Sequence, residues 1–166
     1  MPLLPSWLKK REKNSLLLFL PILLLVHCSH RTEQVEVLFQ SPQGLNFYQL
    51  EVAKTGQQRA QGLMFREKLP SRAGMLFVFP QKTASPFWMK NTPLSLDILF
   101  INERGVIVDL IERATPFSEE LLIPKEPYAY VIEIRGGSSL ALGVRVGGQV
   151  RLPEACYQRI APCDPS

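Results

Sequence analysis

The sequence predicts a mainly β domain, a single sandwich or barrel of about eight strands with one or two short helices, behind an N-terminal signal or anchor segment. Short β-like runs separated by turn residues dominate the chain, and no helical pattern is long enough to cover both faces of an α/β sheet. Hydrophobic residues make up 46% and charged residues 20% of the 166 residues. This mixture excludes a disordered or fibrous chain, and the length fits one domain.

The expected strands are hydrophobic and β-branched runs bounded by Gly, Pro, Asn or Ser. They cover residues 35–39, 47–52, 75–79, 87–90, 96–101, 106–111, 128–134 and 149–152. The turn sequence Asn102-Glu103-Arg104-Gly105 between two of these runs predicts a hairpin. The run 128–134 alternates, which places Tyr128 and Tyr130 on one face and Val131 and Glu133 on the other.

Two segments are expected to be helical. Residues 55–63 begin with Thr55, a residue type that caps helix N-termini. Residues 138–142 are followed by Gly143, which favours the end of a helical turn.

Residues 1–27 are predicted to be a signal peptide or membrane anchor. Lys9, Lys10, Arg11 and Lys13 precede an apolar stretch at residues 15–26, which is short for a membrane-spanning helix. With Glu12 these residues carry a net charge of +3, and subtracting this from the total of +4 leaves +1 for residues 28–166. An almost neutral body disfavours binding of a nucleic acid backbone.

Cys28 follows the apolar stretch in a pattern that resembles a bacterial lipobox, although His27 stands where that pattern has a small residue. The resemblance implies lipidation at Cys28; cleavage nearby and an uncleaved anchor are the alternatives. All three place the body outside the cytoplasm, periplasmic or tethered on the outer side of the membrane. There Cys156 and Cys163 are expected to form a disulfide, with two free thiols on the tail as the alternative. Residues 28–34 are read as a tether, 35–155 as the domain and 156–166 as a tail.

The residue inventory limits the chemistry of the body. The two histidines are His27 and His30, so residues beyond 30 have no Ser-His-Asp triad, Cys-His pair or multi-histidine zinc site. No phosphate-binding loop or dinucleotide fingerprint is present. We expect no metal and no cofactor. Acid–base chemistry would rest on one of five carboxylates: Glu51, Asp97, Asp109, Glu112 or Glu133.

Four linked elements carry a resemblance to a known family. They are GLMFR at residues 62–66, GMLFVF at 74–79, WMKNT at 88–92 and LDILFI at 96–101. In this order and spacing the chain resembles the domain-of-unknown-function 192 family over about residues 35–152. The resemblance implies a jelly-roll-like, mainly β domain that is often exported, and it implies no activity. Ser95, where the family usually has proline, and Gly147-Gly148, where it usually has Gly-Asp, depart from the pattern.

The candidate ligand-binding residues are a mixed aromatic and polar set around the WMKNT element: Trp88, Lys90, Asn91, Asp97 and Arg66. An indole offers a stacking surface and an ammonium group an anion partner at the mouth of a cleft. The structural alternative is a core Trp88 followed by a plain turn. Asp97 lies in an apolar run, so it needs a partner, and Arg66 and Lys90 are the candidates.

These features favour a non-enzymatic binding or envelope-accessory module over an enzyme. Its expected partners are a small molecule, sugar or peptide at this cluster and the membrane through the N-terminal segment. The alternatives are a histidine-free hydrolase that uses carboxylates such as Asp97, and a structural scaffold.

Overall fold

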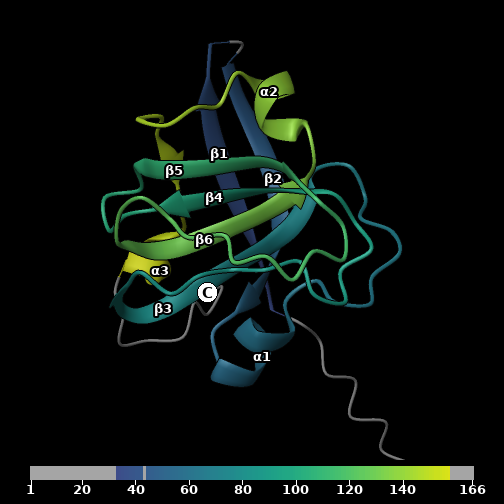
Figure 1. Ribbon diagram of the computed structural model, residues 1–166. Helices are drawn as coiled ribbons and strands as arrows, with labels where there is room; N and C mark the ends of the chain where they lie inside the picture. The colour runs from purple at the N-terminus through teal and green to yellow at the C-terminus, as the bar shows by residue number, and fades with distance from the viewer. Residues whose placement is uncertain (1–32, 43, 158–166) are drawn as a thin grey trace, which may run out of the picture. The chain divides into compact units, whose positions relative to one another are not determined.

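The computed structural model describes residues 33–42 and 44–157, and its described strands form one curled, half-barrel sheet (Figure 1). The seven described strands are β1 (Gln34–Ser41), β2 (Gly44–Ala53), β3 (Ala73–Thr83), β4 (Leu96–Ile101), β5 (Ile107–Ala114), β6 (Tyr128–Arg135) and β7 (Val150–Arg151). Three short helices accompany them within the same residues: α1 (Gly56–Gln61), α2 (Ser138–Leu142) and α3 (Glu154–Tyr157).

The strand order in the sheet is β5-β4-β6-β3-β2-β1-β7. All neighbours are antiparallel except β2 and β3, which run parallel. A parallel pair needs a long crossover connection, and residues 54–72 supply it with α1 inside. A bridge between Val106 and Gln149 links the segments that precede β5 and β7, so the ends of the order approach each other and the sheet curls.

The prediction of a mainly β domain is confirmed, with differences in detail. Seven of the expected runs form the strands of the sheet. The run 87–90 makes only a single bridge, from Phe87 to Leu122, because Met89 instead donates its backbone N–H to Ser118 in a neighbouring loop. The predicted hairpin forms as β4 and β5, and the two predicted helices form as α1 and α2. The signal or anchor segment and Cys28 lie outside the described residues.

The central strands are buried on both faces, because a separate hydrophobic core covers each. On β6, Tyr130, Ile132 and Ile134 belong to a first core shared with β1, β2 and β7. Val131 belongs to a second core on the opposite face. The second core contains Met75 and Phe77 of β3, Ile98 and Phe100 of β4, and Leu63, Leu69 and Met89 from the connections. The alternation in the sequence therefore separates two cores, and not core from solvent.

Helix α1 is fixed over β3 by its own polar residues. Thr55 and Gln58 form a capping box, in which each side chain accepts a hydrogen bond from the other residue's backbone N–H. Arg59 donates from Nη1 to the carbonyl oxygen of Val78 in β3 at 3.0 Å. The helix thus forms one wall above the second core.

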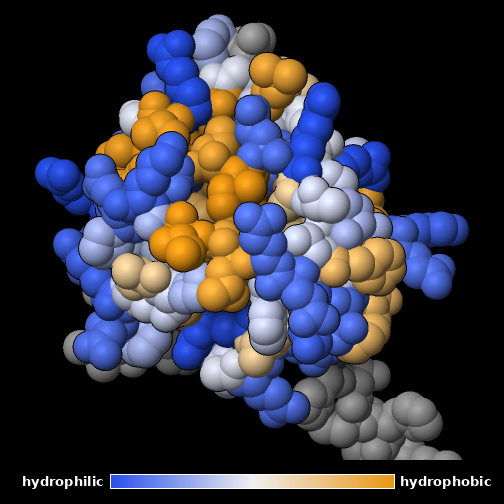
Figure 2. Space-filling model, in the orientation of Figure 1, coloured by the Kyte–Doolittle hydropathy of each residue, from blue (hydrophilic) through white to orange (hydrophobic). Residues whose placement is uncertain are grey.

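On the face seen in Figure 2, hydrophobic residues gather over the part of the sheet where β4 and β5 lie. The side chains of Val108, Leu110 and Ile111 in β5 are only half-buried, since β5 is the edge of the sheet.

No helix among the described residues is both long enough and apolar enough to cross a membrane.

Candidate functional site

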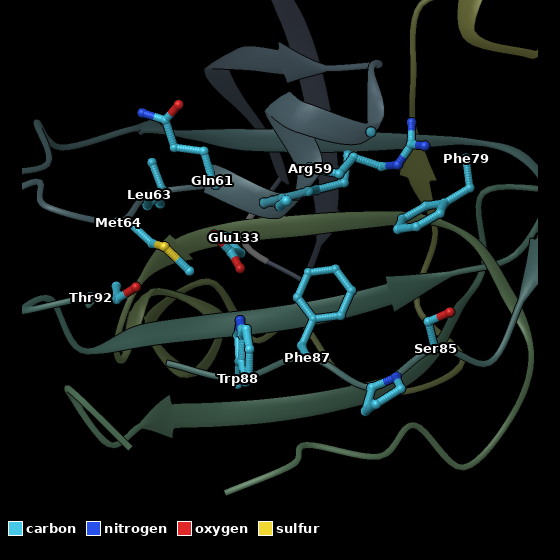
Figure 3. Close-up of a pocket in the computed structure, with 15 residues that line it drawn as sticks. Arg59, Gln61, Leu63, Met64, Phe79, Ser85, Phe87, Trp88, Thr92 and Glu133 are labelled. Atoms are coloured by element: carbon cyan, nitrogen blue, oxygen red, sulfur yellow. The ribbon is translucent and has the colours of Figure 1, made fainter. Parts of the chain in front are cut away.

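A pocket of about 460 Å³ lies between α1, β3, the segment 85–92 and the central strand β6 (Figure 3). We call it the Trp88–Glu133 pocket, after the aromatic and the acidic residue that face each other in it. Its lining residues are Gly56, Arg59, Ala60, Gln61, Gly62, Leu63, Met64, Phe77, Phe79, Ser85, Pro86, Phe87, Trp88, Thr92 and Glu133.

Glu133 reaches this pocket because of its register in β6. It pairs with Met75 of β3 on one side and with Ile98 of β4 on the other. Both neighbours belong to the second core, so the Glu133 side chain lies between hydrophobic residues at the base of the pocket. Glu133 is only 5% exposed, and Figure 3 shows its carboxyl group directed into the pocket.

Glu133 has no partner within the described part of the chain: no hydrogen bond or ion pair of its carboxyl group is found there. Burial raises the pKa of Glu133 to about 8, because the charged form is removed from water without compensation. At neutral pH the group is therefore mostly a neutral carboxylic acid, which can donate as well as accept a hydrogen bond.

Two other carboxylates that are buried as whole residues, Asp97 and Asp109, are satisfied. Asp97 accepts hydrogen bonds from the backbone N–H groups of Arg113, Gly137 and Ser139 and from the Ser139 hydroxyl, at 2.6 to 2.9 Å. Asp109 accepts from two backbone N–H groups and lies 3.6 Å from the ammonium group of Lys125. Glu133 therefore stands out as a carboxyl group that the fold itself leaves without a donor.

Aromatic rings form the wall opposite α1. Phe87 packs edge-to-face against Phe77 and Phe100, with ring centroids 5.4 and 5.6 Å apart. Tyr128 contacts the same cluster, and its hydroxyl donates to the carbonyl oxygen of Ser85 at 2.7 Å. This bond holds the start of the segment 85–92, so Trp88 stands at the pocket with 44% of its surface exposed.

Gly62 keeps the space beside Glu133 open. It ends α1 with φ of +50°, and its N–H donates to the carbonyl oxygen of Gln58. A Cβ atom there would lie 3.2 Å from Cζ of Phe77 and 3.9 Å from Oε2 of Glu133. A larger residue would be strained and would fill the pocket.

Three residues with left-handed backbone conformations gather near the pocket. Phe65, Asn91 and Phe117 have φ values of 63°, 54° and 59°. The N–H of Phe65 donates to the carbonyl oxygen of Asn91, and the N–H of Phe117 donates to that of Thr92, so the three loops are joined. Non-glycine residues in this region are strained, and such strain concentrates at functional sites.

The structure separates the residues that the sequence predicted as one binding cluster. Trp88 lines the pocket, whereas Lys90 lies outside it, with its ammonium nitrogen 5.4 Å from the Trp88 ring centroid and 3.5 Å from Glu119. Asn91 is a turn residue. The binding roles of Trp88, Lys90 and Asn91 stay predictions.

The expected ion partners of Asp97 were wrong. Arg66 pairs with Glu51 through both of its terminal nitrogens, and Lys90 pairs with Glu119. Asp97 is fully buried among backbone donors, because it lies on the face of β4 opposite to Ile98 and beside the turn before α2. Cys156 is buried in α3, while Cys163 lies outside the described residues, so their disulfide stays a prediction.

Sequence reasoning named Glu133 among the acidic residues but did not place it in the binding cluster. The residues around Glu133 could have indicated its burial. Val131, Ile132 and Ile134 place hydrophobic side chains on both faces of the strand, which is typical of a central strand. A glutamate inside such a strand must be buried, and a buried acid needs an explanation.

A second hollow, of about 580 Å³, lies beside the residues Glu67–Pro70 and Arg135. Its strongest polar group, the Arg135 guanidinium, already donates to the carbonyl oxygen of Leu69. It offers no buried polar side chain that lacks a partner, so the Trp88–Glu133 pocket is the stronger candidate.

Comparison with known proteins identifies relatives of the chain. A crystal structure from Sinorhizobium meliloti 1021, described as a candidate transcription regulator, shares 37% identity and a TM-score of 0.70 over 73% of this chain and 95% of that one. A protein of unknown function from Novosphingobium aromaticivorans DSM 12444 shares 32% identity and a TM-score of 0.71 over 76% and 90%. No curated protein matches. The model of the DUF192 family, described as an uncharacterized ACR, matches residues 38–152. The chain therefore belongs to the DUF192 family.

Proposed function

We propose that the domain is a non-enzymatic module that binds a small organic ligand in the Trp88–Glu133 pocket. One observation carries the proposal: a buried carboxyl group without a partner among the described residues faces an open, aromatic-walled hollow. The described part of the fold supplies hydrogen-bond donors to Asp97 and Asp109 but none to Glu133. In our proposal, a ligand supplies the hydrogen-bond partner that Glu133 lacks.

The composition of the lining supports a ligand of small size. Small-molecule sites combine hydrophobic and aromatic walls with a few polar groups that set orientation. Phe77, Phe87 and Trp88 supply the walls here, and Glu133 and Thr92 supply polar groups. Rings held by edge-to-face contacts lose little freedom when a ligand binds, which favours affinity.

The hydrolase alternative has less support from the geometry. Glycoside cleavage needs two carboxyl groups about 5–10 Å apart on either side of the substrate. Glu133 is the one carboxyl group among the lining residues of the pocket, and Asp97 is fully buried elsewhere. A carboxylate pair is thus not available in this pocket.

A role in transcription, as in the description of one relative, finds little support in the charge of this chain. Binding of DNA depends on a basic face, whereas residues 28–166 carry a net charge near zero. The scaffold alternative would use the hydrophobic area over β4 and β5.

We also propose that the chain is exported and held on the outer side of the membrane. The support is the positive segment at Lys9–Lys13, the apolar stretch at residues 15–26 and the cysteine at position 28. We further propose that the strands are connected as in a jelly roll, which the family resemblance implies.

The test is a screen of small amines, acids, amides, sugars and dipeptides by saturation-transfer NMR on the full chain in mild detergent, with empty micelles as blank. We expect at least one class to bind. Ala60→Trp fills the pocket from α1 and should remove the binding, whereas Gln57→Trp, an exposed α1 position outside the lining, should keep it.

Two results would overturn the proposal. One is that no class binds to the folded chain. The other is that bound compounds are insensitive to both Ala60→Trp and Trp88→Ala, since binding would then take place elsewhere.

A further inference from the structure

We propose that the natural ligand is an organic cation with a planar amidinium or guanidinium group, whose charge pairs with Glu133 and whose apolar part lies against Phe87 and Trp88. This inference rests on the proposed binding function and specifies its ligand class. It follows from three observations: the unmet bonding capacity of Glu133, the chemistry of the rings, and the charges around the pocket.

In its ionised form, Glu133 lacks hydrogen-bond donors among the described residues for both of its carboxylate oxygens. The two oxygens of a carboxylate accept parallel hydrogen bonds from a planar, forked cation, which is the strongest pairing open to it. The chain already uses this pairing at Glu51, where both Arg66 nitrogens donate to the two carboxylate oxygens. Glu51 and Glu133 lie in one row across the sheet, since both pair with Met75 in the register. At Glu51 an arginine of the chain supplies the cation; at Glu133 no residue of the described chain does.

The rings around the pocket already accept cations. The ammonium group of Lys90 lies 5.4 Å from the centroid of Trp88, and the guanidinium carbon of Arg59 lies 5.0 Å from that of Phe79. An aromatic face attracts a cation through its quadrupole, and more strongly where water is excluded. Phe77 and Phe87 are further aromatic residues of the lining, and a Cβ atom on Gly62 would lie near both Phe77 and Glu133.

The described groups that face Glu133 would leave its negative charge uncompensated when it ionises. From β3 and β4 its register neighbours are the apolar Met75 and Ile98, and the segment 85–92 contributes no charged lining residue. From α1 the one charged lining residue is Arg59. Its Nη1 donates to the carbonyl oxygens of Lys54 and Val78, and it forms no ion pair with Glu133. An anionic ligand would oppose the ionisation of Glu133, whereas a cation would supply the positive charge that the ionised carboxylate lacks.

The test uses three probes of the same shape and different charge: benzamidine (cation), benzamide (neutral) and benzoate (anion). Binding to the full chain in mild detergent is measured by isothermal titration calorimetry in two buffers of different ionisation enthalpy. We expect benzamidine to bind at least about tenfold more tightly than benzamide at pH 8, and benzoate most weakly. Because Glu133 must ionise to pair with benzamidine, binding below pH 8 should release a proton, and affinity should rise with pH toward a plateau above pH 8.

A matched pair of variants assigns the effect to one carboxyl group. Glu133→Gln keeps the shape and should reduce benzamidine affinity at least about tenfold while it changes benzamide affinity little. Glu126→Gln removes an exposed carboxylate outside the pocket and should change neither. Circular dichroism checks that both variants are folded.

The outcomes separate this inference from the proposed function. If benzamide or benzoate binds as tightly as benzamidine and Ala60→Trp blocks it, the cation inference is overturned and the binding function stands. If benzamidine binds equally well to the Glu133→Gln variant, the pairing with Glu133 is overturned. If screened compounds bind in the pocket and none of the three probes does, the cation inference is also overturned. Failure of every compound in the screen overturns the binding function itself.

Discussion

Burial of Glu133 without a partner in the described part of the chain opposes folding, and this cost is the main support for the binding role that we propose for it. A carboxyl group in an apolar floor, without a partner from the described residues, opposes folding whenever it would otherwise be ionised. A hydrophobic residue at this register position between Met75 and Ile98 would pack without that cost. On our proposal, the position of this group is explained by a ligand that it binds and not by a contribution to stability.

The first prediction concerns the pH dependence of stability. The pKa of Glu133 is about 8 in the folded state against 4.5 as reference, so between these values the unfolded chain loses a proton that the folded chain keeps. Stability should then fall as pH rises, by up to about 1.4 kcal/mol per pH unit from this group. In Glu133→Gln this contribution disappears, so the variant should gain stability relative to the wild type from pH 5 to pH 8.

Chemical denaturation of both proteins from pH 5 to pH 9 checks this prediction. The Glu126→Gln variant serves as control, because it removes a carboxylate that is exposed. Parallel pH profiles of the wild type and Glu133→Gln would show that Glu133 has an ordinary pKa.

The second prediction concerns the backbone strain at Phe65. This residue is 71% exposed and has a positive φ, so its ring contributes little packing while its backbone is strained. Phe65→Gly and Phe65→Ala both remove the ring, but only glycine tolerates this conformation freely. The glycine variant should be more stable than the alanine variant by about 1 kcal/mol. Thermal unfolding of the two variants measures the difference, and equal stabilities would refute strain at this position.

At the scale of elements, Asp97 connects three parts of the fold. It lies in β4, and its carboxylate accepts hydrogen bonds from Arg113 of β5, from Gly137 before α2 and from Ser139 within α2. Its prediction as a ligand-binding residue came from its place in an apolar run, which indicates burial and partners but does not identify them. The donors are backbone groups from distant segments, and a sequence motif does not show these.

The third prediction follows from this arrangement. Asp97→Ala leaves several buried N–H groups without an acceptor and should lower the free energy of unfolding by about 3–5 kcal/mol. Asp97→Asn keeps one acceptor oxygen and should cost less. Urea unfolding measures both losses. The affinity of the folded Asp97→Asn variant for benzamidine should equal that of the wild type, and a selective loss of affinity would instead place Asp97 in the binding site.

The elements themselves were largely predictable from local sequence. The boundaries of β4 and α2 agree with the predicted residues 96–101 and 138–142, because apolar runs and a following glycine are local signals. The run 87–90 was predicted as a strand, yet its partner choice depends on a distant loop around Ser118. The β2–β3 crossover decides which strand lies beneath α1, and hence where the pocket lies. Local sequence patterns do not specify this crossover.

At the scale of the whole molecule, the sequence predicted the fold class and one residue of the pocket, Trp88. It did not predict that Trp88 and Glu133 line one pocket, because 44 residues lie between them in the chain and only the fold places them at the same site (Figure 3). Residue type alone also grouped Lys90 and Arg66 with Asp97, although each has an acidic partner of its own.

The fourth prediction concerns processing of the whole chain. We expect the protein extracted from membranes to begin at Cys28 and to carry lipid there, since the residues before it have the pattern of a secretory signal. Intact mass spectrometry measures both features, and the same spectrum should show two hydrogens fewer than the reduced chain if Cys156 and Cys163 are joined. A soluble chain that retains residues 1–27 would contradict the expected export.

The most direct test of the central claim is a ¹³C NMR titration of the Glu133 carboxyl group, assigned with Glu133→Gln, in the free protein and with benzamidine. We predict a pKa of about 8 in the free protein, which falls when the cation binds. A pKa close to 4.5 that benzamidine leaves unchanged would contradict both the unpartnered state of Glu133 and its role in the pocket.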